Sequence, residues 1–270
     1  MIQNRAEILQ FSLLLQFPEL IHGTNTRIGG VSQGVYQSLN MGWTLGDDEE
    51  KVRENYQIFA DILGFPMESY TLSDQIHKAE IAVIEEKDRG NGVSFVKKDN
   101  LKGMDGLITN QKDVALTIFS ADCVPLLFYD PKKKVIGAAH SGWRGTVQDI
   151  AGKMVDIMTG RYGCQAEDIY VGIGPCIGKD NFEVGPDVKK EFEKLGKYDI
   201  LNKIFQPKGK DKYLLDLRSY IAHGLREKGI QQIEISQECT YGQPELFFSH
   251  RRDGLQRGSH ISVIYLKAEE

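Results

Sequence analysis

Nine short apolar runs constrain the fold of this chain more than any other feature of its sequence. Runs of this length that are bounded by turn-forming or charged residues predict β-strands. They cover residues 20–25, 81–85, 107–110, 114–121, 124–129, 135–139, 169–173, 233–236 and 260–266. The runs between 107 and 139 follow one another without an intervening helix, which indicates partly antiparallel pairing.

Four segments predict helices from the spacing of their apolar residues: 48–63, 146–159, 186–195 and 217–228. Glycines at 64, 196 and 229 end three of them. The most polar stretch, 188–212, predicts a solvated helix followed by a surface loop. Because helices and strands mix without strict βαβα alternation, we expect one α/β domain over residues 1–270, with mixed sheets flanked by helices.

The composition is ordinary for a globular protein, with 41% apolar and 26% charged residues. A net charge of −5 gives no overall field that would attract nucleic acid. The apolar run 9–17 is too short to span a membrane, and the start of the chain lacks a signal-peptide pattern. Four cysteines without a CxxC pair do not predict a disulfide framework. We therefore expect a cytoplasmic protein that binds neither nucleic acid nor membrane.

Three potential metal ligands, His77, Cys123 and His140, each lie in or beside a short strand-like segment. Taken singly, each is more simply a core residue. Together, two imidazoles and one thiolate are the ligand set of a catalytic zinc site with an open fourth position. The runs 115–121 and 135–139 are separated by a turn-like polar cluster at 130–134, so we expect neighbouring strands whose ends bring Cys123 and His140 together.

Other polar residues near these ligands have two readings each. Residues 141–145 form a glycine-bounded turn before a predicted helix, which favours an anion site with Arg144 as a donor, although a surface arginine fits equally well. Asp122 faces away from Cys123 if the strand is regular, or is a hydrogen-bond acceptor or proton carrier if the strand ends there. Residues 248–254 are a surface loop or a second anion contact.

The remaining candidate motifs favour structural roles. Residues 172–178 are rich in glycine but lack the GxGxxG spacing, so we expect no dinucleotide site there, and we expect Cys176 to pack rather than ligate. His22, His223 and His260 are most simply structural residues.

The chain resembles the YlmD/YfiH-type purine nucleoside phosphorylases, formerly described as laccase-domain or multicopper polyphenol oxidase proteins. The matching segments follow the family's order at residues 26–32, 38–40, 75–77, 121–125, 139–145, 174–177 and 249–253. The resemblance implies a layered α-β-β-α arrangement with mixed sheets flanked by helices, and a zinc site made by His77, Cys123 and His140. Within it we assign catalysis to Cys123, His140 and Asp122. We assign substrate binding to Arg27, Asn40, Gln75, Arg144 and Arg251.

The resemblance also implies phosphorolysis of adenosine, inosine, guanosine and S-methyl-5′-thioadenosine, with adenosine deaminase activity in the same pocket. The partners are then a nucleoside and inorganic phosphate, and the chain is a monomer or homodimer. The rival reading is a metal-free amide hydrolase that edits peptidoglycan precursors, with Cys123 as nucleophile and His140 as base. A non-catalytic binding protein is a third class. A multicopper oxidase needs more histidines than the six scattered here, although Cu²⁺ could occupy the same three ligands.

Overall fold

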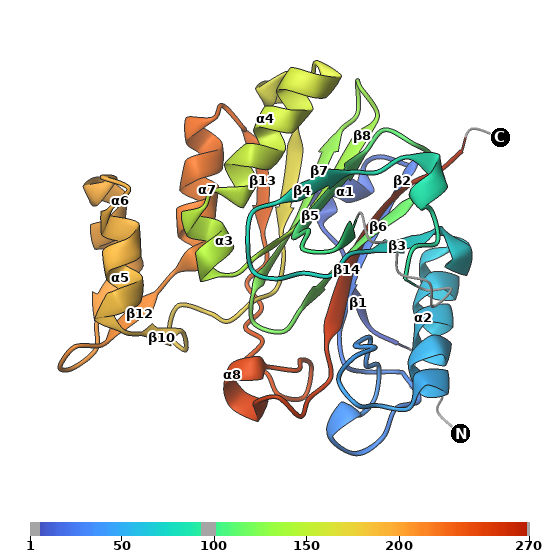
Figure 1. Ribbon diagram of the computed structural model, residues 1–270, viewed down its shortest axis with the longest axis horizontal. Helices are drawn as coiled ribbons and strands as arrows, with labels where there is room; N and C mark the ends of the chain where they lie inside the picture. Colours follow the sequence, from blue (N-terminus) through green and yellow to red (C-terminus); the bar gives the residue numbers. More distant parts are fainter. Residues whose placement is uncertain (1–5, 93–100, 269–270) are drawn as a thin grey trace.

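Two large mixed β-sheets lie face to face between layers of helices (Figure 1). The computed structural model describes residues 6–92 and 101–268. One sheet has the order β13 (Gln232–Ile235), β9 (Tyr170–Ile173), β7 (Val124–Asp130), β8 (Val135–Ser141), β5 (Gly106–Thr109) and β4 (Ile81–Val83). The other has the order β1 (Ile8–Leu9), β2 (Leu20–Asn25), β14 (His260–Leu266), β6 (Ala115–Ser120) and β3 (Tyr70–Leu72).

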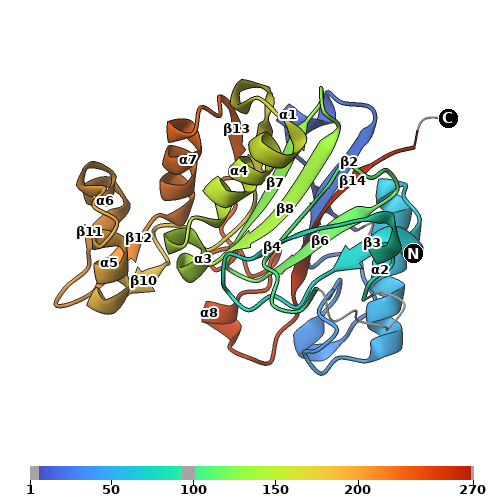
Figure 2. The same cartoon turned by 45° about the horizontal axis from the view of Figure 1, so that its top comes forward.

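Helices cover the outer faces of both sheets. α4 (Ile150–Tyr162) and α7 (Leu217–Glu227) cover the first sheet, and α2 (Glu49–Leu63) covers the second (Figures 1 and 2). A lobe projects to one side and contains α5 (Pro186–Glu193), α6 (Tyr198–Ile204) and a small sheet of β10 (Glu183–Val184), β12 (Tyr213–Leu215) and β11 (Phe205–Pro207). The shorter helices are α1 (Ser12–Leu15), α3 (Trp143–Val147) and α8 (His250–Asp253). This arrangement confirms the expected α-β-β-α layering.

Three hydrophobic clusters fill the spaces between these layers. Along β7, Leu126 and Phe128 face the cluster beneath α4 and α7, while Leu127 and Tyr129 face the cluster between the sheets. A third cluster lies between the second sheet and α2. Because side chains alternate along a strand, a strand buried on both faces must be apolar throughout. This explains why the sequence shows continuous apolar runs rather than alternation.

The β7–β8 hairpin brings two of the predicted ligands together. β7 pairs antiparallel with β8, and Pro125 lies opposite His140. The Asp130 carboxylate stabilises the turn by accepting hydrogen bonds from the backbone N–H groups of Lys132 and Lys133. Cys123, just before β7, therefore lies beside His140, as expected. The partner strand was predicted wrongly, because the run 115–121 contains β6 of the other sheet.

Two predictions about helices were wrong. Instead of one helix over 146–159, α3 ends at Val147 and α4 begins at Ile150. Asp149 separates them with a left-handed backbone (φ 57°), and its side chain caps α4 by accepting from the N–H of Gly152.

The polar stretch 188–212 is not simply a solvated helix and loop. It contains most of α5, all of α6 and β11, whose residues Phe192, Leu201 and Ile204 are buried in the cluster beneath α4 and α7. No helix among the described residues has the length and apolar character that crossing a membrane requires.

Candidate metal centre and its cavity

One buried carboxylate, Asp105, holds two of the three predicted ligands. It lies immediately before β5 and accepts backbone N–H bonds from Ile76 (3.1 Å), His77 (3.0 Å) and Lys78 (2.8 Å). These bonds fix the loop that carries His77, whose own backbone is left-handed (φ 61°). The sequence reading did not identify Asp105. Its only signal there was an acidic residue at the edge of an apolar run.

Asp105 also orients the second imidazole. Its Oδ1 lies 2.9 Å from Nδ1 of His140, and its backbone carbonyl accepts the N–H of His140 at 2.7 Å. Burial raises the pKa of Asp105, but bonds from His140 and the 76–78 backbone lower it below its ordinary value. The carboxylate is thus ionised and Nδ1 of His140 donates to it, which leaves Nε2 as the ligand atom.

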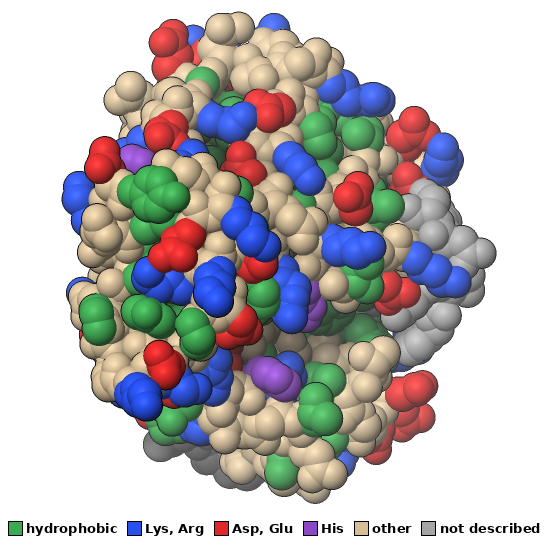
Figure 3. All heavy atoms as spheres, turned by 60° about the vertical axis from the view of Figure 1, so that its left-hand side comes forward, with side chains coloured by type: hydrophobic (Ala, Val, Ile, Leu, Met, Phe, Trp, Pro, Cys, Tyr) green, Lys and Arg blue, Asp and Glu red, His purple; other side chains and the backbone are tan. Residues whose placement is uncertain are grey.

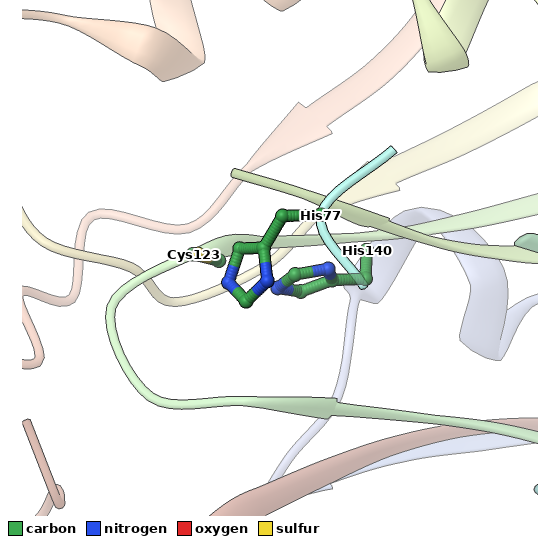
Figure 4. A group of neighbouring side chains, drawn as sticks. All are labelled: His77, Cys123 and His140. Atoms are coloured by element: carbon green, nitrogen blue, oxygen red, sulfur yellow. The ribbon is translucent and has the colours of Figure 1, made fainter. Parts of the chain in front are cut away.

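Cys123 completes the group from the start of β7. The potential ligand atoms of His77, Cys123 and His140 all lie within 4.8 Å of one another. The two imidazole rings meet edge to face, with centroids 4.8 Å apart, and Cys123 lies beside them (Figure 4). His77 is exposed, Cys123 is partly buried and His140 is buried. One thiolate and two imidazoles at this spacing could hold a metal ion, and the donor set fits zinc.

Gly142 makes this convergence possible. A Cβ placed on Gly142 would lie 3.0 Å from Sγ of Cys123 and 3.2 Å from Cδ2 of His77. The backbone conformation of Gly142 (φ −73°) is open to any residue, so the requirement for glycine here is one of space.

The electrostatics of the group favour a thiolate. Burial raises the pKa of Cys123, but the charges and hydrogen bonds of His140 and His77 outweigh it and lower that pKa below its ordinary value. Burial lowers the pKa of His140, and the Cys123 thiolate and Asp105 carboxylate outweigh it and raise that pKa. Each partner therefore stabilises the charged form of the other. A thiolate is also the form that binds a metal.

The strand ends before Asp122, so of the two expected readings of this residue the structure favours the hydrogen-bond acceptor. Its carboxylate accepts hydrogen bonds from Thr240 Oγ1 (2.6 Å), Ser249 Oγ (3.0 Å) and the backbone N–H of Arg251 (2.6 Å). It thereby ties α8 and the 240 loop to the segment that carries Cys123. The acceptor beside His140 is Asp105, and the catalytic role of Asp122 stays a prediction.

A cavity of about 900 Å³ opens beside the three ligands, all of which line it. Gln75, Arg144 and Arg251 also line it, as predicted substrate-binding residues should. On the face turned forward in Figure 3 the surface is hollowed, with histidine side chains beside the hollow and Lys and Arg side chains along one flank. His250, from the segment considered as a second anion contact, also lines the cavity, as does Arg257, which was not identified from the sequence.

Arg27 and Asn40 are not among the cavity-lining residues. Arg27 donates to the carbonyl oxygens of Gln37 and Pro244 and lies over the Phe248 ring. Asn40 is buried, and its Oδ1 accepts the N–H groups of Gly42 and Ser259, which do line the cavity. Both residues shape the surrounding loops in this structure, and their contact with substrate stays a prediction.

The other histidines and Cys176 have the structural surroundings expected for them. His22 and His260 are buried on adjacent strands, and each Nε2 accepts a backbone N–H at 2.8 Å, from Phe11 and Phe248 respectively. Cys176 is buried within the hydrophobic cluster beneath α4 and α7, as expected for a packing residue. His223 lies on α7, 3.5 Å from Glu227.

The layered fold and the Cys–His–His group lining a cavity define an α/β protein with a site that could bind a metal ion. The chain belongs to the family described as multi-copper polyphenol oxidoreductase laccase, whose model matches residues 21–267. It is 38% identical over 251 residues to purine nucleoside phosphorylase YlmD of Bacillus subtilis, covering 92% of this chain and 89% of that protein.

Two solved structures share the fold. YfiH of Bacillus licheniformis, titled a hypothetical protein, superposes with a TM-score of 0.91 and 35% identity, covering 99% of this chain and 98% of that one. YlmD of Geobacillus stearothermophilus gives a TM-score of 0.87 and 32% identity, covering 98% of this chain and all of that one (100%). These comparisons confirm the resemblance drawn from the sequence.

Proposed function

We propose that this protein is a zinc-dependent purine nucleoside phosphorylase that acts on adenosine, inosine, guanosine and S-methyl-5′-thioadenosine. The observation that carries the proposal is the convergence of His77, Cys123 and His140 on one wall of a cavity, in a chain that matches named purine nucleoside phosphorylases over most of its length. The cavity has ample room for a nucleoside and a phosphate ion.

The ligands' surroundings suit this role. Zinc, when bound, supplies a Lewis acid that polarises a substrate atom. Asp105 keeps His140 in one tautomer and holds the His77 loop, so the ligands need little rearrangement. Arginines on the cavity wall supply positive charge for inorganic phosphate.

Adenosine deaminase activity in the same cavity belongs to the same proposal. Both reactions would use one metal centre, so both should depend on Cys123.

The proposal includes a cytoplasmic location, because the site needs a thiolate and all four cysteines are free. Cu²⁺ could occupy the same ligands, since affinity for such sites rises toward copper.

The proposal is tested by chromatography of the products formed from adenosine and phosphate, with and without a chelator. We expect adenine and ribose 1-phosphate, with inosine as the deamination product, and loss of all three on chelation. Cys123→Ala should lose zinc and both activities. Cys164→Ala removes a buried thiol beside Asp130, at the other end of β7, and should keep them. Full phosphorolysis by Cys123→Ala without zinc would falsify the proposal.

A second candidate, a Cys–His amide hydrolase acting on peptidoglycan precursors, is favoured by one observation. Cys123, His140 and Asp105 form a chain of nucleophile, base and orienting carboxylate. Metal analysis of protein purified without an affinity tag separates the two candidates. About one zinc per chain and slow alkylation of Cys123 by iodoacetamide support the phosphorylase, whereas a metal-free, fast-reacting thiol supports the hydrolase.

A further inference from the structure

The arginines near the cavity differ in how many of their guanidinium N–H groups donate hydrogen bonds to other protein groups. Arg252 donates to the carbonyl oxygens of Thr240, Tyr241 and Phe247 and pairs with Asp253. Arg251 donates to the carbonyl oxygen of Glu183 and lies over the Phe182 ring. These groups hold the protein's own loops together. The donors of Arg252 are therefore largely committed before any ligand arrives, whereas Arg251 makes one side-chain hydrogen bond to the described residues and is exposed, so water can satisfy its remaining donors.

Arg144 and Arg257 have other surroundings. Arg144 is exposed at the start of α3, and its guanidinium lies 4.3 Å from the centre of the Trp143 ring. Arg257 lies between α8 and β14, is largely buried and lines the cavity. Among the residues that the structure describes, its buried Nε has no hydrogen-bond partner, and its one side-chain bond runs from Nη1 to the carbonyl oxygen of the next residue, Gly258, at 3.2 Å.

The charge on Arg257 has no partner within ion-pair distance among the described residues. Asp122 is the nearby carboxylate, but Thr240, Ser249 and the backbone of Arg251 supply its hydrogen bonds. A largely buried cation without a direct ion pair is unfavourable, because it has lost water and gained only longer-range attraction to nearby anions. An anionic ligand in the cavity would remove that penalty.

Arg257 also lies close to the candidate metal centre. Burial lowers the pKa of Arg257, and the charges of Asp122, Cys123 and Asp253 act in the opposite direction. The thiolate and the guanidinium therefore interact electrostatically across the same part of the cavity. An anion held by Arg257 would lie beside a substrate bound at the metal centre.

We propose that Arg257 is the anchor of the inorganic phosphate in this cavity, an inference that rests on the proposed phosphorylase function. The planar guanidinium can present two parallel N–H donors to two phosphate oxygens, which a lysine cannot do. In phosphorolysis a phosphate oxygen bonds to C1′ of the ribose while the C1′–N bond breaks. The electron pair of that bond leaves with the purine nitrogen, which takes up a proton. Arg257 holds the attacking anion during this exchange, and the exposed Arg144 is not required to do so.

The inference is tested with Arg257→Gln and Arg257→Lys, and with Arg161→Gln as a control that removes an exposed arginine of α4. For zinc-loaded protein, we expect Arg257→Gln to raise the KM for phosphate at least about tenfold, the effect of losing a charge-assisted pair. The KM for inosine should change less than about twofold, since the nucleoside does not use this group. Arg257→Lys retains the charge and should fall between Arg257→Gln and the wild type.

Binding is measured separately from turnover by the shift in melting temperature that inorganic phosphate causes without nucleoside. We expect a shift in the wild type and in Arg161→Gln, and its loss in Arg257→Gln. An unchanged phosphate KM and an unchanged shift in both Arg257 variants would overturn the inference while the phosphorylase function stands. Phosphate binding that depends on Arg257 in a protein without phosphorolysis would instead support the anion site and overturn the proposed function. If Arg257→Gln does not fold, Arg257→Lys decides, because a wild-type KM for phosphate in that variant contradicts the need for a guanidinium.

Discussion

At the scale of single residues, the candidate metal centre depends on groups that do not themselves ligate. Asp105 accepts bonds from both histidine-bearing segments, so one carboxylate sets the positions of His77 and His140. Gly142 leaves the space into which Cys123 and His77 project. Substitution of either residue should therefore affect zinc binding, although neither residue is a potential ligand.

Asp105→Asn should weaken zinc binding by about 10- to 100-fold, because the amide cannot accept all the bonds that the carboxylate accepts. The measurement is a competition between the protein and a chelator of known zinc affinity. Asp199→Asn, an exposed change on α6, is the matched control. Equal zinc affinity in both variants would show that Asp105 does not position the ligands.

Gly142→Ala should also reduce zinc affinity, since its Cβ would press against Sγ of Cys123 and the His77 ring. Gly160→Ala is a matched control, because a Cβ there meets nothing within 4 Å and lies within α4. The control should keep zinc and gain up to about 1 kcal/mol of stability from helix propensity. Zinc titration and urea unfolding of both variants check this pair, and wild-type zinc affinity in Gly142→Ala contradicts it.

At the scale of secondary-structure elements, the lobe of α5, α6 and β10–β12 differs most from its sequence reading. Its lysine-rich sequence suggested a solvated segment, but one side of the lobe is buried. Phe192 contacts the rings of Phe205 and Tyr220 edge to face, with centroids 5.4 and 5.0 Å apart. The lobe therefore packs on the same hydrophobic cluster as α4 and α7.

Phe192→Ala should lower the free energy of unfolding by about 3–5 kcal/mol, the usual result of emptying a buried aromatic site. Leu195→Ala, two residues beyond α5 and 39% exposed, should change it by less than about 1 kcal/mol. Urea denaturation of both variants gives the comparison. Similar small changes in the two would mean that the lobe is as solvated as its composition suggested.

At the scale of the whole molecule, buried neutral histidines make stability depend on pH. Burial lowers the pKa of His22 to about 4 and that of His260 to about 3. Both Nε2 atoms accept backbone N–H bonds, so protonation would break those bonds. The unfolded chain takes up these protons near its ordinary histidine pKa, before the folded protein does.

The stabilising contribution of His22 is therefore complete above a pH of about 6.5 and is lost as the pH falls toward about 4. The wild type should lose about 2–3 kcal/mol more stability than His22→Gln between about pH 7.5 and about pH 4.5. Urea unfolding at the two pH values measures this, with His223→Gln as the control on α7. A parallel loss in the wild type and His22→Gln would contradict the prediction.

Sequence alone was enough to predict most strands, three of the four long helices and the three potential metal ligands that the structure brings together. These features depend on local patterns: apolar runs, capping residues, and a hairpin that brings Cys123 and His140 together across 17 positions of chain. The extent of the domain over residues 1–270 stays a prediction.

Only the tertiary structure decided what surrounds those ligands. Asp105 reaches His140 because β5 pairs with β8, and Asp122 meets Thr240 and Ser249 from distant loops. Arg257 stands in no recognisable motif, and the role proposed for it follows from its burial with no ion-pair partner among the described residues. Residue types and spacing determine which side chains can perform a given chemistry. The burial of these side chains and the compensation of their charges depend on tertiary packing between distant segments, so a local sequence pattern cannot predict them.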